Sequence, residues 1–356
     1  ALQRDGVTDI APWDQRFYER LLKEQKHDVD IEETKAYFEL GNVTKGLLRH
    51  AEKLFDIEFK DAGGKYPVYD DDVNVYEVHN RKSGELIGVL YTDYYARPGR
   101  KKGGAWKAQF RDRGLDENGQ DQIPLVTNNC TFDKPPEGEP TLLSIVDVET
   151  MFHELGHGLH SLLGKGRYPS LTGTSVLYDF VELPSQLMEN WVLEDEVLDT
   201  FAVHHETGAP MPKDMVEKIR ALNKEGNGLA GLRQTFFGLL DMTWHTTDPD
   251  DIHSVEQLEE GIYKNAQVYD WKGLTQSPGF GHLFSDPVGY SAGYYGYKWA
   301  EILDADVFTL FQKNGLYDPE TSRNLREIIY EKGDTEAPDK LFRDLMGRDP
   351  DPQALM

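Results

Sequence analysis

Residues 151–160, MFHELGHGLH, constrain the fold more than any other stretch, because three histidines and a glutamate interrupt an otherwise apolar run. The apolar positions from residue 147 to 163 recur at helical spacing: Val148, Met151, Phe152, Leu155, Leu159, Leu162 and Leu163. This pattern predicts an amphipathic helix with its apolar face on a core. His153 and His157 are four residues apart, so they lie on one side of that helix.

Two neutral imidazoles at this spacing can both bind one zinc ion, and Glu154 is placed to hold a water beside it. This His-Glu-x-x-His arrangement is typical of zinc proteases. The alternative is a helix with solvent-facing histidines. Cys130 is the only cysteine, so the other ligands must be His, Asp or Glu. We expect His160 to pack away from the metal.

A catalytic zinc needs a third protein ligand, and the stretch LYDFVELPSQLMENW offers Glu182. Pro184 fits the first turn of a helix, so a new helix is predicted to begin at Glu182. Glu189 lies two turns further on the same face and is a candidate partner for a ligand histidine. Glu149 competes for that role, and either carboxylate could instead be a surface charge.

The composition excludes several classes of partner. The chain has 38 basic and 63 acidic residues, a net charge of −25, which opposes binding to nucleic acid or anionic membrane. No run approaches the ~20 apolar residues that span a bilayer. The first residues show no signal peptide, so we expect a cytoplasmic location. A periplasmic or secreted location after loss of a leader is the alternative.

Element patterns predict an α+β fold that is mainly helical. Helical spacing to about residue 59 is followed by a small β-sheet over about residues 67–133, with NVYEVHN and LIGVLYTDYY as a hairpin. QIPLVTNNCTF is predicted as a strand, either an edge strand that pairs with a peptide or an ordinary sheet strand. Zinc-binding helices follow over about residues 146–195. We expect residues 1–356 to form a single catalytic domain.

Three motifs in this order, MFHELGHGLH, DFVELPSQLMENW and GYSAGYYGYKWAEILDADVF, resemble the thimet oligopeptidase family of zinc metallopeptidases, with its oligopeptidase A and peptidyl-dipeptidase members. The resemblance also covers PWD near the start, DYYARPGRKKGGAW and FRDLMGRDPDPQALM. It implies a zincin-like catalytic domain with one Zn²⁺ per chain. It further implies His153, His157 and Glu182 as zinc ligands and Glu154 as the general base.

The resemblance also implies roles for a tyrosine-rich substrate loop at about residues 279–297. His282, Tyr294 and Tyr297 match positions that contact substrate or stabilise the tetrahedral intermediate, and Tyr297 is our candidate for the oxyanion. Tyr290, Gly289 and Gly293 are expected to bind substrate, because glycines let a loop close over a peptide. We expect Tyr295 to be a packing residue.

Members of this family are about twice as long, with a helical N-terminal half. The chain therefore resembles the catalytic half, and we expect a missing half or a separate chain to supply the rest. The predicted function is internal cleavage of short peptides. The alternatives are release of C-terminal dipeptides and a half-enzyme that binds zinc and peptides without turnover.

A basic cluster interrupts the acidic sequence: Arg97, Arg100, Lys101 and Lys102. These side chains either grip the C-terminal carboxylate of a peptide or belong to a solvated loop.

Overall fold

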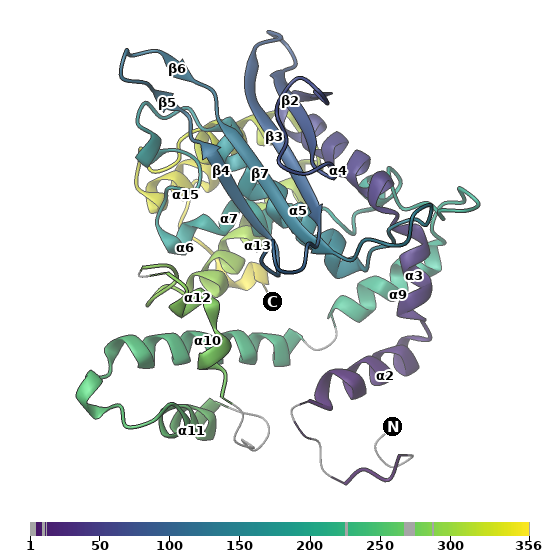
Figure 1. The fold of residues 1–356 in the computed structure, drawn as a ribbon, viewed down its shortest axis with the longest axis vertical. Coiled ribbons are helices and arrows are strands. Elements are labelled where there is room, and N and C mark those ends of the chain that lie inside the picture. Colours follow the sequence, from purple (N-terminus) through teal and green to yellow (C-terminus); the bar gives the residue numbers. More distant parts are fainter. Residues whose placement is uncertain are drawn as a thin grey trace. The chain divides into compact units, whose positions relative to one another are not determined.

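The computed structural model describes residues 5–8, 11, 13–224, 227–266, 275–286 and 288–355. The chain divides into two compact units (Figure 1). The smaller unit comprises Ala1–Ile31 and Pro212–Trp299, and the larger unit comprises Glu32–Met211 and Ala300–Met356. None of the described helices is both long and apolar enough to cross a membrane.

A five-stranded sheet organises the larger unit, in the order β1-β2-β3-β7-β4. Its strands are β1 (Ile57–Asp61), β2 (Asn74–Asn80), β3 (Leu86–Tyr95), β4 (Trp106–Arg111) and β7 (Leu125–Phe132). β3 and β7 are parallel, and the other neighbouring pairs are antiparallel. A two-stranded sheet, β5 (Gly114–Leu115) with β6 (Asp121–Gln122), lies between β4 and β7 in the sequence.

The strands confirm the predicted hairpin and correct two expectations. The stretch that forms β1 was predicted to be helical, and this prediction is wrong. The preceding helix ends at Asp56, which adopts a left-handed backbone, φ 53°, and β1 begins at the next residue. The predicted strand β7 exists but is not an edge strand, since it pairs with β3 on one side and β4 on the other. The edge on that side of the sheet is β4.

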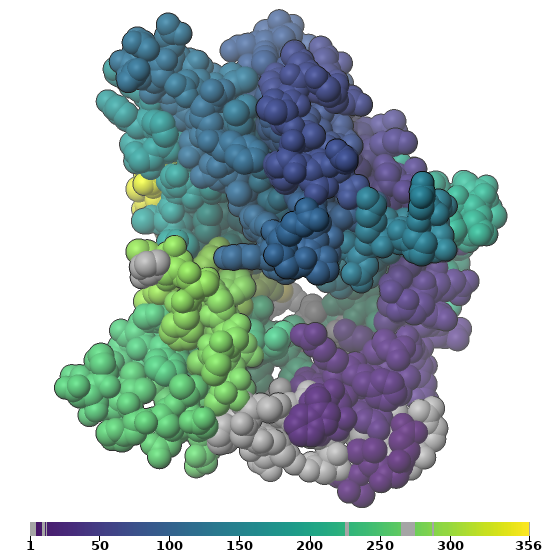
Figure 2. Space-filling model, viewed as in Figure 1, coloured from purple at the N-terminus to yellow at the C-terminus, as the bar shows by residue number. Residues whose placement is uncertain are grey.

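Helix α5 (Ile145–Leu163) covers one face of the sheet. Contact is close at two glycines: a Cβ on Gly88 would lie 2.6 Å from Leu162 Cδ2, and one on Gly158 would lie 2.5 Å from Asn128 Oδ1. The opposite face carries an apolar cluster that includes Val75, Val89 and Tyr91. Strands and loops of the sheet, in blue, form the near surface of this unit (Figure 2).

The remaining elements of the larger unit are helical. They are α4 (Leu40–Phe55), η1 (Lys35–Tyr37), η2 (Pro169–Leu171), α6 (Tyr178–Val181), α7 (Leu183–Glu189), α8 (Asp195–Leu198), α14 (Pro319–Leu325), η5 (Arg326–Tyr330), α15 (Pro338–Met346) and η6 (Pro352–Leu355). Trp191 is fully buried, with its ring centroid 4.8 Å from those of Phe308 and Phe311. The unit boundaries in the sequence fall inside two further helices, α3 (Ile31–Thr34) and α13 (Gly296–Asn314).

The smaller unit is helical throughout its described part. Its elements are α2 (Gln15–His27), α9 (Lys213–Lys224), α10 (Asn227–Thr246), η3 (Pro249–Asp251), α11 (Val255–Ala266), η4 (Ser277–Gly279) and α12 (Gly281–Phe284). α10 packs on α11, and α2 packs on α9. Phe237, Phe280 and Tyr294 lie in its main apolar cluster. The chain as a whole is α+β and mainly helical, as predicted.

Candidate metal centre

Helix α5 presents the two motif histidines on one side. A capping box starts the helix: Ser144 Oγ accepts from the Asp147 amide, and the Asp147 carboxylate accepts from the Ser144 amide at 2.8 Å. The rings of His153 and His157 then stand one turn apart, with centroids separated by 4.9 Å. The observed bounds agree with the predicted helix over residues 147–163.

Glu182 lies at the junction of α6 and α7, immediately before the predicted proline turn. α5 and α7 approach closely at Gly156, where a Cβ would lie 2.5 Å from the carbonyl oxygen of Pro184. Only a residue without a side chain allows this approach. The glycine inside the motif therefore brings the carboxylate against the histidine side of α5.

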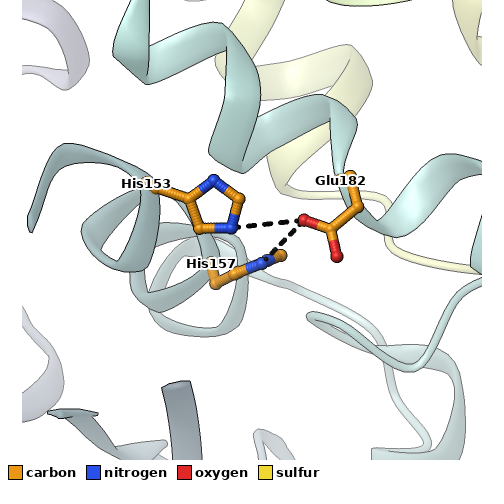
Figure 3. Close-up of side chains that lie close together, drawn as sticks. All are labelled: His153, His157 and Glu182. Atoms are coloured by element: carbon orange, nitrogen blue, oxygen red, sulfur yellow. Dashed lines mark ion pairs between the residues drawn. The ribbon is translucent and has the colours of Figure 1, made fainter. Parts of the chain in front are cut away.

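The three side chains converge on one point (Figure 3). Glu182 Oε2 lies 3.3 Å from His153 Nε2 and 3.1 Å from His157 Nε2. Ligand atoms ~2.0–2.1 Å from a tetrahedral zinc are separated by about 3.3 Å, so these spacings suit a shared ion. Ser185 Oγ donates to the same Oε2 at 2.8 Å and orients the carboxylate.

The hydrogen bonds indicate that a cation belongs at this point. His153 Nδ1 donates to Glu189 Oε1 at 2.6 Å, which leaves Nε2 of a neutral ring with only a lone pair. That lone pair faces the oxygen of Glu182, and two acceptors at this distance repel each other unless a proton or a metal lies between them. The donor set therefore fits a zinc ion, and Glu189 is the carboxylate that orients His153.

The pKa shifts of Glu182 and His153 both favour the charged form of the side chain, whereas that of His157 does not. Burial opposes ionisation of Glu182, yet the neighbouring His157 and His153 hold the pKa of its carboxyl well below the ordinary value. Burial also opposes protonation of His153, but hydrogen bonds to Glu182 and Glu189 raise its pKa well above the ordinary value. Burial lowers the pKa of His157.

Glu154 follows His153 on α5, is 5 % exposed, and its Oε2 has no hydrogen-bond partner among the described residues. Burial raises the pKa of Glu154 to about 7, against the opposing charge of His153. A carboxylate with a pKa near neutrality can accept and return a proton at physiological pH.

The other candidates on α5, His160 and Glu149, are not among the three converging side chains. His160 is fully buried, its ring makes an edge contact with Tyr330, and it is not one of the converging side chains. Glu149 is partly buried one turn before His153. Of the two carboxylates considered as partners, Glu189 makes the hydrogen bond to His153.

A second group of possible ligands, His204, His205 and Glu206, lies in the loop after α8. His204 Nδ1 accepts from the Glu206 amide at 3.2 Å, so Nε2 of a neutral ring carries the hydrogen and cannot bind a metal. The two rings are nearly parallel, 11° apart, and one ion cannot lie in both ring planes. This arrangement is a poor metal site.

The predicted tyrosine loop lies in the smaller unit and forms an aromatic cluster. The rings of Tyr290 and Tyr297 stack 5.1 Å apart, and His282 makes edge contacts with Tyr290, Tyr294 and Tyr297. Tyr294 is buried against Phe237 and Phe280, whereas Tyr295 is 46 % exposed. Tyr295 is therefore not a buried packing residue as expected, whereas Tyr294 is buried and Tyr290 and Tyr297 pack against the same apolar cluster.

Asp241 on α10 anchors this loop, which sequence reasoning did not foresee. Its carboxylate accepts from the amides of Ala292 and Tyr294 at 2.8 and 2.9 Å. Gly289 adopts a left-handed backbone, φ 39°, and a Cβ there would meet the His282 carbonyl at 3.1 Å. Of the two glycines expected to shape the loop, Gly289 has a conformation that favours glycine, and Gly293 does not.

Two residues of the basic cluster before β4 are paired with a carboxylate, whereas Arg100 and Lys102 are exposed. Arg97 and Lys101 both form ion pairs with buried Asp93, and the Lys101 side chain is 4 % exposed. The expectation of a solvated loop is wrong for these two residues. Arg97 also pairs with Asp70 at 3.4 Å, so two carboxylates balance the two positive charges.

Sequence reasoning also missed β4 and the lysine it carries. The stretch WKAQFR alternates apolar and polar residues over six positions, which is the pattern of a half-buried strand and would have identified it. Lys107 interacts electrostatically with Glu154.

Comparison with known proteins gives one family. The family model described as "Peptidase family M3" matches residues 1–356. Organellar oligopeptidase A, chloroplastic/mitochondrial, of Arabidopsis thaliana is 36 % identical over all of this chain and 46 % of its own length. Oligopeptidase A of Escherichia coli is 34 % identical over 99 % of this chain and 51 % of its own length. Dipeptidyl carboxypeptidase of Escherichia coli is 34 % identical over 98 % of this chain and 50 % of its own length.

Proposed function

Because the chain belongs to peptidase family M3, we propose that it is a zincin-like peptidase that hydrolyses short peptides. One Zn²⁺ per chain is held by His153, His157 and Glu182. The observation that carries this proposal is the convergence of two imidazole nitrogens on one carboxylate oxygen, at 3.1 and 3.3 Å.

When bound, the zinc ion supplies Lewis-acid chemistry, which polarises a peptide carbonyl and acidifies a water. Glu154 accepts a proton from the attacking water and passes it to the leaving amine. Its burial and its pKa near 7 support both steps. Glu189 holds His153 in the tautomer that leaves Nε2 available to bind a metal ion.

We propose that Tyr297 stabilises the oxyanion of the tetrahedral intermediate, with His282 and Tyr294 beside it. The residues proposed to contact the substrate are Tyr290, Gly289 and Gly293. The clustering of the four rings and the anchoring of the loop by Asp241 support a preorganised group. A phenol donates one hydrogen bond where charge develops. Tyr297→Phe should lower kcat by about 10²-fold without changing zinc content, and unchanged kcat would remove this assignment.

The peptide backbone adds to the outer edge of β4. Among the described strands β4 has one paired side, toward β7, so its other side can pair with an extended peptide. Backbone pairing of this kind tolerates many sequences, which suits a peptidase of broad specificity.

Two modes of cleavage are consistent with the relatives. We propose internal cleavage, as the name oligopeptidase A indicates for two relatives. Release of C-terminal dipeptides is the second candidate, because another relative at 34 % identity is named dipeptidyl carboxypeptidase. Mass spectrometry of the products from one peptide with a free and an amidated C-terminus separates the two. Amidation should abolish dipeptide release and leave internal cleavage unaffected.

The chain spans about half the length of the curated relatives it matches. We propose that residues 1–356 act as one catalytic domain and that a helical N-terminal half, in a longer chain or a separate one, restricts substrate size. We propose a cytoplasmic location, with a periplasmic or secreted location as the alternative. A half-enzyme that binds zinc and peptides without turnover is the remaining candidate, and turnover by this chain alone would exclude it.

The decisive experiment combines metal analysis with hydrolysis of a short quenched peptide. We expect one zinc per chain in both the parent protein and Glu154→Gln. The substitution should lower kcat by roughly 10²–10⁴-fold, because it removes the proton acceptor but no ligand. Chelation should abolish hydrolysis by the parent, and readdition of zinc should restore it. Full activity of Glu154→Gln would refute the mechanism.

A further inference from the structure

Lys107 lies on the edge strand β4, on the sheet face that α5 covers. It pairs with Asn128 of β7, and paired residues of antiparallel strands point to the same face. Asn128 points toward α5, because its Oδ1 lies against Gly158. The Lys107 side chain therefore lies between the open edge of the sheet and the helix that carries Glu154.

The ammonium group of Lys107 retains an unused donor and an unpaired charge. Nζ donates to Gln109 Oε1 at 2.6 Å and to Thr174 Oγ1 at 2.7 Å, and both acceptors are neutral. A lysine has three donors, so one remains. Within the part of the chain that the structure describes, Lys107 forms no ion pair, whereas Arg97 and Lys101 are paired with Asp93.

Lys107 stays mostly cationic at neutral pH although its burial disfavours the charged form. Burial lowers the pKa of Lys107 to about 8, with Asp112 and Glu154 opposing the shift. The amine is therefore mostly protonated at pH 7. Its contact with Thr174 joins β4 to the loop between α5 and α6. Because β4 is the edge strand, a peptide that paired with it would pass beside Lys107.

We infer that Lys107 determines specificity by binding a carboxylate of the peptide substrate beside Glu154. This inference rests on the proposed function and deepens it. The carboxylate belongs either to an acidic side chain or to the peptide C-terminus. Glu182 and Glu189 also act electrostatically on Glu154, and their negative charges oppose an anionic substrate.

The test uses one peptide sequence in four forms, with Gln or Glu at one position and with a free or amidated C-terminus. Further sets of the same four forms carry the Gln or Glu residue at other positions of the peptide. Binding is measured by fluorescence anisotropy on zinc-loaded Glu154→Gln protein, which does not consume the peptide. The same protein carrying Lys107→Met, Lys107→Arg or Lys82→Met is compared. Lys82 is an exposed lysine at the β2–β3 turn and controls for loss of one charge. Turnover is measured in parallel with Glu154 intact.

We expect a peptide carboxylate to tighten binding by about tenfold or more, and Lys107→Met to remove that preference. Neutral peptides should change by less than about threefold. Lys107→Arg should retain part of the preference, and Lys82→Met should retain all of it. Dependence on Glu identifies an acidic side chain, and dependence on the free terminus identifies the C-terminal carboxylate.

An unchanged preference in Lys107→Met overturns the inference. Equal weakening of every peptide also overturns it, because Lys107 would then support binding without recognising a carboxylate. Absence of peptide binding also overturns it. Failure of the proposed function gives a different result: a carboxylate preference that depends on Lys107 in the binding measurement, with no cleavage by the protein that retains Glu154.

Discussion

Glu189 fixes the orientation of His153 through a single hydrogen bond of 2.6 Å. Removing this partner frees the ring to rotate and to change tautomer, so Glu189→Ala should weaken zinc binding by about 10–100-fold. Glu189→Gln should have a smaller effect, because its amide oxygen can still accept from Nδ1. Competition with a fluorescent zinc chelator measures both affinities. Glu149→Ala is the comparison, and an equal loss there would show that His153 does not depend specifically on Glu189.

His160 should make folding sensitive to acid, because burial lowers its pKa to about 3 from an ordinary 6.5. Between these values the unfolded chain binds a proton that the folded protein does not. Stability is therefore retained above pH 6.5 and falls by about 1.4 kcal/mol per pH unit as the pH decreases toward 3. His160→Phe should remove this contribution. Neither ring nitrogen has a hydrogen-bond partner among the described residues, so phenylalanine leaves no group unpaired.

Urea unfolding of metal-free protein at pH 7.5, 6.5, 5.5 and 5.0 measures this difference. The free energy of unfolding of His160→Phe should decline less steeply than that of the parent below pH 6.5. His50 is also buried, with its pKa lowered to about 3, and it is present in both proteins, so its contribution cancels. Parallel curves for the two proteins would contradict the prediction.

Individual residues of the site were predictable to different degrees. The spacing of His153 and His157 on a helix determines their common direction, and Pro184 identifies the start of the helix that carries Glu182. The choice between Glu149 and Glu189 was not predictable, because it depends on where α7 crosses α5. Lys107 was missed because its role follows from its strand partner Asn128, which the local sequence does not reveal.

The crossing of α5 and α7 depends on Gly156, where an added Cβ would lie 2.5 Å from Pro184 O and 2.6 Å from Ser185 Cα. Both are backbone atoms and cannot move alone, so Gly156→Ala should separate the helices and draw Glu182 away from His157. We expect zinc affinity to fall by at least about tenfold and the unfolding temperature to decrease. Competition titration and calorimetry measure the two effects.

Gly231→Ala is the matched control on α10, where a Cβ would have no neighbour nearer than 3.8 Å. There the exchange should be neutral or stabilising by about 0.5–1 kcal/mol, because alanine favours a helix. Unchanged zinc affinity in Gly156→Ala would show that the close approach is not needed for the site.

At the scale of helices and strands, the sequence predicted those elements whose apolar residues recur with a clear period. Helix α5 and the β2–β3 hairpin were found from their periodicity, and β7 was found as a strand. The sheet order was not predictable, because the pairing of β7 with both β3 and β4 joins segments far apart in the sequence. β1 was missed because Asp56, rather than a glycine, ends α4 in a left-handed conformation.

At the scale of the whole molecule, a zinc ion bound at the proposed site would couple its binding to folding. His153 and His157 come from α5 and Glu182 from the start of α7, so the three ligands hold one ion only when both helices pack. Zinc should therefore raise the free energy of unfolding, by about 2.7 kcal/mol at a free concentration 100 times Kd. Thermal unfolding with buffered zinc and with chelator measures the shift.

Two variants determine which ligand group is responsible for that shift. His153→Ala should lose most of the stabilisation, because the remaining pair of ligands binds zinc weakly. His204→Asn should retain it, since the parallel rings of His204 and His205 cannot share an ion. Stabilisation that survives in His153→Ala but disappears in His204→Asn would move the metal to the second group. The chemistry proposed for Glu154 would then lack its metal ion, because the zinc would be bound in the loop after α8.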